Sequence, residues 1–395
     1  MKETTCVDEA ADFIRGITFK PDQLVEVDDE DAIVCMRTKN VQKELDETDL
    51  IAVPRSIIKN QDKFLREGDI LISSANSWDL VGKCSYVWKL GYTATAGGFI
   101  GIVRPKAGKT HPRFFYHWLN SAPTQHLVRN LGRQTTNISN LDVNRFKELQ
   151  FLKLNYAEQE RIAAVLDKAD GIRRKRNIVF SSIENFMKSE FVARFGTPMS
   201  NSNHIPTAPI KMLGKVVTGN TPPRKDPKNY GDGIEWIKSD NINTPSHFLT
   251  QANEHLSTVG KQIGRVVPAG STLVTCIAGS PSVIGNAALA DREVAFNQQI
   301  NAVIPNEQTD PFFLYCQIIV AKPLIQSSST NSMKGMVSKG KFQEIEFLQP
   351  SHDEQVEFGK FFSRTIAVSK RLHADWDASE QLFSALIQRA FRGEL

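Results

Sequence analysis

The chain has 395 residues, of which 23% are charged and 41% hydrophobic, with a formal net charge of +4 and a pI near 8.7. These values are ordinary for a globular protein, so they argue against a disordered chain, and the length predicts two or three domains that each bury a core. The charge is compatible with a phosphate-binding surface but is too small to demonstrate one.

The cysteines and the first residues bear on where the protein works. The five cysteines are scattered and form no CxxC pair, which argues against a disulfide framework and against a zinc site. The N-terminal residues MKETTCVDEAADF are acidic where a signal peptide is apolar, and no stretch approaches about 18 uninterrupted apolar residues. We therefore expect a cytoplasmic protein.

The chain begins with a mixed block, residues 1–153, followed by a helical block, residues 154–196. In the mixed block, strand-like runs occur at Ala32–Met36 (AIVCM), Ile70–Ser73 (ILIS) and 99–103 (FIGIV), with turns between them. The helical block contains no proline within 156–195. A helix over 158–195 would be about 57 Å long at 1.5 Å per residue, which exceeds the width of one domain.

The second half repeats this order. The polar, proline-bearing stretch at 196–209, GTPMSNSNHIPTAP, is expected to be a linker. Residues 197–350 form a second mixed block, with strand-like runs at 273–277 (LVTCI) and 300–304 (INAVI), and residues 351–395 form a second helical block. The fold class expected from this order is α+β, with two similar mixed domains joined by two long helices.

The two halves also repeat each other residue by residue. NRFKELQFL at 144–152 returns as GKFQEIEFL at 340–348, and the pair Glu158 and Gln159 returns as Glu354 and Gln355 at the same offset of 196 residues. The mixed blocks match more loosely, with offsets between 199 and 203: 37–41 resembles 238–242, and 68–72 resembles 270–274. This pattern predicts a tandem duplication with an internal pseudo-two-fold repeat and different loops on one scaffold.

Both helical blocks show 4-3 spacing. The positions are Val165, Ala169, Ile172, Arg176, Val179, Ile183 and Phe186 in the first block, and Phe361, Thr365, Val368, Leu372, Asp375, Ser379, Leu382 and Leu386 in the second. We expect the two stripes to pack against each other as an antiparallel coiled coil. The alternative is an ordinary amphipathic helix lying on a globular core.

Several motifs resemble one family. The C-terminal residues at 386–395, LIQRAFRGEL, are similar to the ending of the specificity subunits of type I restriction–modification enzymes. FLKLNYAEQERI at 151–162 and FLQPSHDEQ at 347–355 resemble that family's Leu-Pro motif followed by Glu-Gln, although the first copy lacks the proline. GNTPP at 219–223 with YGDGIEWIK at 230–238 resembles the start of its second target recognition domain, and RGIT at 15–18 with RTKN at 37–40 resembles the first.

The resemblance spans the chain and implies a non-catalytic subunit that reads double-stranded DNA. Residues 1–153 and 197–350 would be target recognition domains, each binding one half of a split, asymmetric site in the major groove, and residues 154–196 and 351–395 would be spacer helices. Two methyltransferase subunits would dock on the helices, and translocase–nuclease subunits would join them to restrict DNA. No cofactor is expected in this chain, since S-adenosylmethionine, ATP and magnesium would bind in the partner subunits.

Base reading requires bidentate groups, notably Arg or Lys for guanine and Asn or Gln for adenine, so polar residues in the matching loops are the candidates. In the first domain they are Thr18, Lys20, Arg37, Lys39, Asn40, Ser74, Asn76, Arg133, Gln134 and Asn137; in the second they are Thr221, Arg224, Lys225, Lys238, Asn241, Ser280, Ser282, Asn297, Gln298, Gln299, Asn331 and Lys334. The basic run at 173–176 is expected to be a solvated or subunit-facing stripe rather than a DNA clamp.

Motifs that carry catalysis were not found in the sequence: it has no GxxxxGK[ST] loop, no GxGxxG, no Asn-Pro-Pro-aromatic tetrapeptide and no HExxH. Three alternatives stay open. The chain could be the specificity subunit of a bifunctional restriction–methylation system that cleaves on both sides of its site, a coiled-coil scaffold whose domains bind proteins, or an enzyme with an unrecognised nuclease centre.

Overall fold

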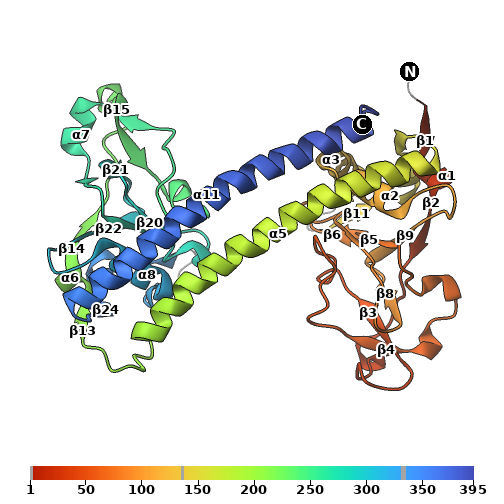
Figure 1. Ribbon diagram of the computed structural model, residues 1–395, viewed down its shortest axis with the longest axis horizontal. Helices are drawn as coiled ribbons and strands as arrows, with labels where there is room; N and C mark the ends of the chain where they lie inside the picture. The colour runs from red at the N-terminus through yellow and green to blue at the C-terminus, as the bar shows by residue number, and fades with distance from the viewer. Residues whose placement is uncertain (1–2, 135–137, 331–334) are drawn as a thin grey trace. The chain divides into compact units, whose positions relative to one another are not determined.

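The computed structural model of the chain describes residues 3–134, 138–330 and 335–395. It divides into two compact units, a first unit of Met1–Arg176 with Trp376–Leu395 and a second unit of Asn177–Asp375. Each unit combines sheets with separate helices (Figure 1), so the α+β prediction is confirmed.

The first unit is built on a four-stranded antiparallel sheet and smaller sheets beside it. The large sheet has the order β2 (Ala11–Arg15), β9 (Ile100–Pro105), β5 (Ile70–Ser73) and β7 (Cys84–Tyr86). In a second sheet, β3 (Ala32–Met36) lies between antiparallel β4 (Ala52–Pro54) and parallel β8 (Ala94–Ala96). Strands β10 (Gly132–Gln134), β11 (Ser139–Leu141) and β6 (Ala75–Asn76) form a third, and β1 (Thr4–Cys6) pairs with β12 (Gln150–Leu152). The short helices are α1 (Val7–Ala10), α2 (Pro112–Leu119), α3 (Ala122–Asn130) and α4 (Val143–Lys147).

The second unit repeats that topology. Its large sheet has the order β14 (Gly214–Thr218), β22 (Ile300–Pro305), β18 (Thr272–Thr275) and β20 (Ala287–Leu289). The parallel pair β15 (Tyr230–Ile237) and β21 (Val294–Phe296) is flanked by β16 (His255–Leu256) and β17 (Val266–Val267). Two further pairs are β19 (Ile277–Ala278) with β23 (Gly335–Met336) and β13 (Thr207–Pro209) with β24 (Glu346–Leu348). The short helices are α6 (Ile210–Leu213), α7 (Thr258–Ile263), α8 (Pro311–Val320), α9 (Lys322–Ser327) and α10 (Lys339–Gln343).

Equivalent turns in the two units confirm that the repeat is structural. Gly82 and Gly285 have φ of 82° and 81°, a region that favours glycine, and each donates its backbone N–H to the strand beside it, at 2.9 Å from the carbonyl oxygens of Ser73 and Thr275. The stretch at 196–209 differs from its prediction as a linker, because its last three residues form β13 and pair with β24. A three-residue strand ending in proline is too short to show periodicity in the sequence.

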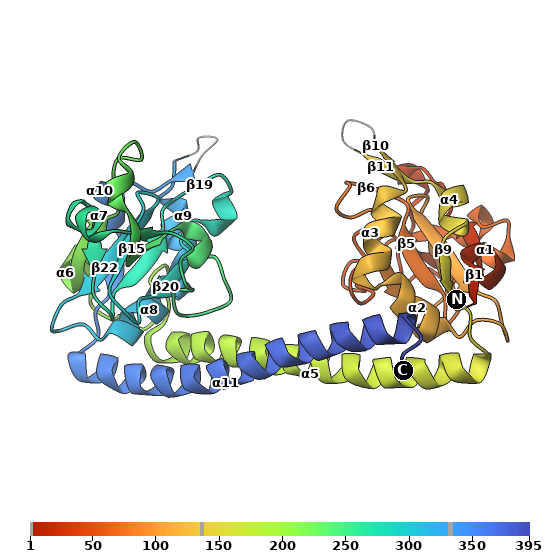
Figure 2. The ribbon, with the colours of Figure 1, turned by 90° about the horizontal axis from the view of Figure 1, so that it is seen from above.

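In each unit a short helix, α2 or α8, follows the last strand of the large sheet and packs between that sheet and the long helices. Phe114 and Phe115 of α2 pack with Ile70 and Val103 of the sheet on one side, and Phe114 contacts Phe391 at 5.3 Å between ring centroids on the other. Figure 2 shows α2 beside the C-terminal end of α11. In the second unit Phe313 of α8 has the same position and lies 5.5 Å from Phe191.

The two long helices, α5 (Tyr156–Phe195) and α11 (His352–Phe391), have 40 residues each and lie inside the helical blocks expected from the sequence, residues 154–196 and 351–395. Within each unit, one half of α5 packs antiparallel against one half of α11. In the first unit Arg173 bonds Glu380 at 3.2 Å; in the second Phe186 lies 5.6 Å from Phe361 and Arg194 bonds Glu357 at 3.1 Å. Within the described residues, none of the helices combines the length and apolar character that a membrane span requires.

The helix face that is buried differs in part from the predicted one, although Ser379 is buried and Ile183, Phe361 and Leu386 are partly buried as predicted. Val165, Ile172, Val179 and Phe186 are between 39% and 54% exposed, and on α11 Val368 and Leu382 are 51% and 59% exposed. The buried stripe lies one residue further along each helix, which is a rotation of about 100°. On α5 it runs through Gln159, Ala163, Leu166, Asp170, Arg173, Met187, Phe191 and Phe195. We call the exposed predicted positions (Val165, Ile172, Val179, Phe186, Val368 and Leu382) the outer stripe.

Polar pairs explain why this face is buried. Arg173 donates to Asp170 from Nε at 3.0 Å and Arg174 donates to the same carboxylate at 2.6 Å, so the basic run at 173–176 is partly engaged inside the protein rather than wholly solvated. Nearby, Asp167 accepts from Arg113 at 2.8 Å and lies 2.7 Å from the His117 ring. Burial alone would raise the pKa of Asp167, but the hydrogen bonds from His117 and Arg113 outweigh it and lower the pKa to about 2.

The glutamines of the repeated Glu-Gln motif fasten each long helix to its unit. The backbone N–H of His111, just before α2, donates to Oε1 of Gln159 at 2.9 Å, and Nε2 of Gln159 donates to the carbonyls of Lys109 and Leu154 at 3.0 and 2.9 Å. Gln355 accepts from Asp310 N–H at 3.2 Å. The motif therefore has the same structural role in both copies.

Candidate nucleic-acid interface

A tight turn lies at the same place in both units. We call residues 97–99, between β8 and β9, the first tip, and residues 297–299, between β21 and β22, the second tip. The chain leaving the first strand of the large sheet presses against each tip: a Cβ on Gly16 would stand 2.1 Å from the carbonyl oxygen of Gly97, and one on Gly219 would stand 2.1 Å from that of Asn297. No side chain fits either gap, so glycine at these positions sets how closely the two segments approach.

In each tip, one backbone carbonyl oxygen also accepts two hydrogen bonds from the start of a short neighbouring strand. The carbonyl of Phe99 accepts from the N–H groups of Ser74 and Ala75 at 2.8 and 3.3 Å, at the start of β6. In the second unit the carbonyl of Gln299 accepts from Cys276 and Ile277 at 2.8 and 3.1 Å, at the start of β19. The tip, the loop after the first strand and the start of β6 or β19 therefore form one surface, which we call the recognition face of each unit.

The first recognition face gathers three of the predicted readers. Thr18 is exposed and lies beside the tip, since a Cβ on Gly98 would be 3.4 Å from its Oγ1. Ser74 and Asn76 are partly exposed on the neighbouring strand; Asn76 donates to Ser73 Oγ at 3.2 Å and accepts from Ser77 N–H at 2.9 Å.

The remaining candidates of the first unit lie elsewhere. Lys20 is exposed after the loop that carries Thr18. Arg133 and Gln134 belong to β10, which pairs with β11, and Asn137 lies outside the described residues.

The second recognition face carries amides in place of these groups. Asn297 is buried and orients its neighbour, since its Nδ2 donates to Gln299 Oε1 at 3.1 Å and its Oδ1 accepts from Gln299 N–H at 3.1 Å. Thr221 donates its hydroxyl to Oε1 of the exposed Gln298. The structure thus brings Thr221, Gln298 and Gln299 together at the tip, with Asn297 as their support.

The other candidates of the second unit are distributed beyond the tip. The hydroxyls of Ser280 and Ser282, both exposed, lie 2.8 Å apart in the loop after β19. Lys225 is exposed, and Asn331 and Lys334 lie outside the described residues.

The asparagines of the RTKN and KSDN motifs have an internal role that differs from base reading. Asn40 is fully buried, accepts from Arg37 N–H at 2.8 Å and donates to the Asp46 carbonyl at 2.8 Å. Asn241 is 6% exposed, accepts from Lys238 N–H at 3.0 Å and donates to the Gln251 carbonyl at 3.0 Å. Both amides are used in folding their own loop.

The basic residues of these loops are held in ion pairs. Arg37 bonds Asp49 at 2.9 Å, and Lys39 also pairs with that carboxylate. In the second unit Arg224 and Lys238 pair with Glu254 at 2.8 and 2.9 Å, and both cations lie over the Trp236 ring. The hydrogen bond from Lys238, with that from Arg224, lowers the pKa of Glu254 despite a partial burial that opposes it. Such exposed pairs exchange partners at small cost, so these cations remain able to contact phosphate.

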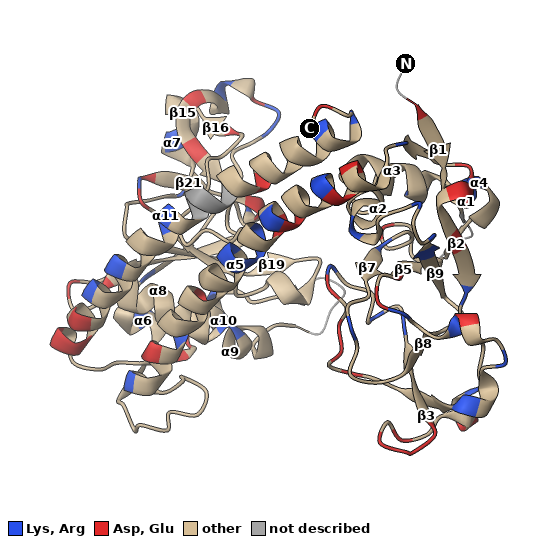
Figure 3. Cartoon of the chain, turned by 45° about the vertical axis from the view of Figure 1, so that its right-hand side comes forward, with Lys and Arg blue, Asp and Glu red and all other residues tan. Residues whose placement is uncertain are grey.

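Charge elsewhere on the units is mixed rather than concentrated. Acidic and basic residues are interspersed along α5 and α11 (Figure 3). Along the described residues of the two helices, this pattern provides no uniformly basic face of the kind that a clamp on the DNA phosphates needs.

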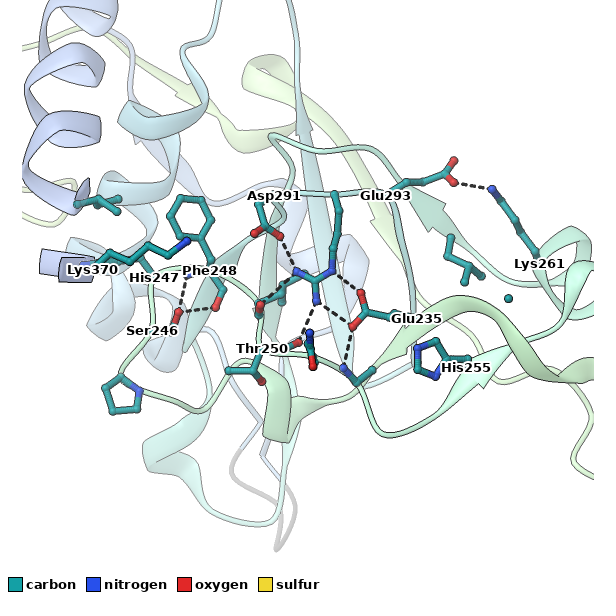
Figure 4. A pocket seen from close by; sticks show the side chains of 18 of the residues that line it. Glu235, Ser246, His247, Phe248, Thr250, His255, Lys261, Asp291, Glu293 and Lys370 are labelled. Carbon is teal, nitrogen blue, oxygen red and sulfur yellow. Dashed lines mark hydrogen bonds and ion pairs between the residues drawn. The ribbon is translucent and has the colours of Figure 1, made fainter. Parts of the chain in front are cut away.

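The second unit also contains a cavity of about 1310 Å³, walled by β15, the loop 245–252 and parts of both long helices. In Figure 4 Glu235 and Asp291 point toward one guanidinium, that of Arg292, which bonds them at 2.9 and 2.5 Å. Lys261 pairs with Glu293 at 2.5 Å and His247 with Glu184 at 2.9 Å. The charges of Arg292 and Lys261 are therefore neutralised within the wall, and the contact of His247 with Glu184 joins the loop 245–252 to α5.

Comparisons with known proteins agree with this geometry. Residues 207–375 match the model of the Type I restriction modification DNA specificity domain. The chain is 30% identical over 201 residues to the HindI type I restriction enzyme specificity subunit of Haemophilus influenzae, covering 46% of this chain and 40% of that protein. It is 21% identical over 424 residues to the StySPI specificity subunit of Salmonella potsdam, covering 99% and 89%.

A solved structure supports the fold over nearly the whole length. The type I restriction–modification S subunit from M. genitalium is 13% identical, covers 99% of this chain and 96% of its own, and superposes with a TM-score of 0.59. The domain model covers the second recognition face, and the internal repeat extends the same scaffold to the first.

Proposed function

We propose that the chain is a specificity subunit of a type I restriction–modification system, which reads a bipartite, asymmetric DNA target and positions partner subunits on it. The main support for this proposal is the pair of recognition faces, which have equivalent backbone hydrogen bonds but different side chains. A duplicated scaffold with different loop chemistry suits two different half-sites of one target.

Each unit would read its half-site with the residues around its tip. In the first unit these are Thr18, Ser74 and Asn76, and in the second Thr221, Gln298 and Gln299. The cations Lys39, Arg224 and Lys238 would contact the phosphates and fix the register, a contribution that depends on salt and carries no sequence information. Arg133, Gln134, Asn137, Asn331 and Lys334 remain proposed readers.

The long helices would have two roles. Forty helical residues correspond to about 60 Å, compared with 34–36 Å for one helical turn of DNA, so helices of this length are suited to setting the number of unread base pairs. The outer stripe, exposed on both helices, would be covered by two methyltransferase subunits. Like positions in the two copies of a repeat are suited to holding two identical partners.

The remaining steps would belong to the partners. Translocase–nuclease subunits would join the methyltransferase complex to restrict DNA, and S-adenosylmethionine, ATP and magnesium would bind in those subunits, leaving this chain a non-catalytic reader. The complex would act in the cytoplasm. The specificity subunit of a bifunctional system that cleaves on both sides of its site would use the same reading surfaces and differ in its partners.

The test is to express the chain with the methyltransferase subunit that we expect to be encoded near it, and to sequence the methylome of the host. We expect methylation at one split motif when the chain is present and none when it is omitted. Methylation that does not depend on the chain, together with no DNA binding by the assembled complex, would refute the proposal. Metal-dependent DNA cleavage by the purified chain alone would instead support a nuclease.

A further inference from the structure

Phe99 stands out at the centre of the first recognition face. It is 67% exposed, the highest value among the large hydrophobic side chains in the part of the chain that the structure describes. The strand residues on either side of the tip are buried, since Ala96 is 0% exposed and Ile100 is 1% exposed. A single exposed apolar residue on a surface is common, so exposure alone does not mark Phe99 as a reader.

The backbone around Phe99 is rigid. Gly97 N–H donates to the Met36 carbonyl at 2.9 Å, Ile100 N–H closes the turn on the Gly97 carbonyl at 2.9 Å, and the Phe99 carbonyl accepts from Ser74 and Ala75. The ring therefore projects from a fixed backbone, and holding it in one place on binding DNA costs little conformational entropy.

Phe99 is also the only side chain of its tip. Gly97 and Gly98 carry none, and a Cβ at either position would lie 3.3 Å from a backbone oxygen, that of Met36 or of Ile17. The second tip has an amide at each of its three positions, Asn297, Gln298 and Gln299. The same point of the scaffold is thus purely apolar in one unit and purely polar in the other.

The surroundings of Phe99 are suited to base edges. Thr18 borders the same turn, and the backbone N–H of Ser74 donates to the Phe99 carbonyl, so both residues with hydroxyl side chains are close to the position of Phe99. In the major groove the one apolar feature of a base edge is the 5-methyl group of thymine, and apolar side chains are the groups that read it. Apolar wedges that separate base steps work in the minor groove, where polar readers find a degenerate pattern.

We propose that Phe99 reads a thymine in the half-site of the first unit by packing its ring on the 5-methyl group. This inference rests on the proposed function and adds to it the identity of one base. The second tip reads its half-site by hydrogen bonds from its amides and makes no such methyl contact.

The chemical probe is replacement of thymine by uracil, which removes only the methyl group. The target is first defined from the methylome, and the assembled complex with the methyltransferase is then titrated with duplexes in which each thymine of both half-sites is replaced in turn. Burying one methyl group corresponds to about a fourfold change in affinity. We expect one thymine whose replacement weakens binding about fourfold in the wild-type complex and has no effect in the Phe99→Ala complex.

Two variants complete the experiment. Phe99→Gln, which gives the first tip the chemistry of the second, is expected to remove the same thymine preference. Met212→Ala removes a side chain that is 59% exposed on α6 of the other unit and is expected to leave every replacement unchanged.

The outcomes separate this inference from the function on which it rests. A complex that reads a split motif but in which no uracil replacement responds to Phe99→Ala would overturn the inference alone. The inference would also be overturned if Phe99→Ala weakened binding while thymine and uracil were equivalent in the wild type, because the ring would then act as a wedge. A complex that reads no split motif would overturn the proposed function and the inference together.

Discussion

The glutamine of the repeated motif provides a quantitative test of how the long helices are attached. Gln159 makes three hydrogen bonds at 2.9–3.0 Å, to His111 N–H and to the carbonyls of Lys109 and Leu154, and it is 4% exposed. An ordinary hydrogen bond contributes about 1 kcal/mol net, and a buried donor left without a partner costs about 1–3 kcal/mol. We expect Gln159→Ala to lower the free energy of unfolding of the first unit by about 3 kcal/mol.

Because the chain has two compact units, the measurement must report on each separately. Hydrogen-exchange mass spectrometry at increasing urea gives the stability of α2 and of the first turns of α5, and of the equivalent segments of the second unit. Gln355→Ala should destabilise the second unit and leave the first unchanged. The control is Glu160→Ala, an exposed neighbour on the same helix, which should change stability by less than about 0.5 kcal/mol. If Gln159→Ala changed stability as little as Glu160→Ala, the inference that Gln159 attaches α5 to the first unit would be wrong.

Three further predictions follow from individual contacts. Gly219→Ala places a Cβ 2.1 Å from the Asn297 carbonyl and should cost about 1–3 kcal/mol in urea unfolding and weaken DNA binding, whereas Gly279→Ala, with nothing within 4 Å, should do neither. Burial lowers the pKa of His117 from 6.5, although Asp167 opposes this, so the unfolded state takes up the proton at a higher pH than the folded state does. The first unit should therefore lose stability as pH falls through 6.5. The urea midpoint should be lower at pH 5.5 than at pH 7.5, and His117→Gln should make this difference smaller. Ile172→Glu, on the outer stripe, should reduce methyltransferase binding by more than tenfold in calorimetry with an unchanged unfolding midpoint, and equal binding would remove that stripe as the docking surface.

The scaffold could be predicted because its signals are periodic or local. The strands at Ala32–Met36 and Ile70–Ser73 are apolar runs between turns, and the structure has them at those residues. The two helices of 40 residues are long runs without proline, and the repeated residues indicate the duplication without any structural information. The strands and helices can be predicted because they depend mainly on residues that are close together in the sequence.

The buried helix face depends on partners far away in the chain. Asp170 and Arg173 are buried because they bond each other and because Glu380 pairs with Arg173, more than 200 residues later. Hydrophobicity alone therefore predicts buried positions, such as Val165 and Ile172, that are exposed in the structure. Polar residues can occupy a core position only when their partners are present, and a pattern along one helix does not contain them.

The recognition faces were predictable only in part for a similar reason. Thr18 and Ser74 lie in matching loops and meet at the tip, but Asn40 is engaged in its own loop, and the motif RTKN alone cannot distinguish a reader from a loop support. Phe99 is absent from the candidates predicted from the sequence, because those are residues that can form hydrogen bonds to bases. The contrast of GGF with NQQ at matching positions is the signal that could have found it.

The central claim is that two similar scaffolds read two different half-sites, and methylome sequencing of tip variants tests it most directly. The chain is expressed with its methyltransferase as the wild type, as Ser74→Ala and as Gln298→Ala. We predict a split motif in which each variant relaxes the base preference in one half only, and in opposite halves. A continuous motif, or two variants that relax the same half, would contradict the claim.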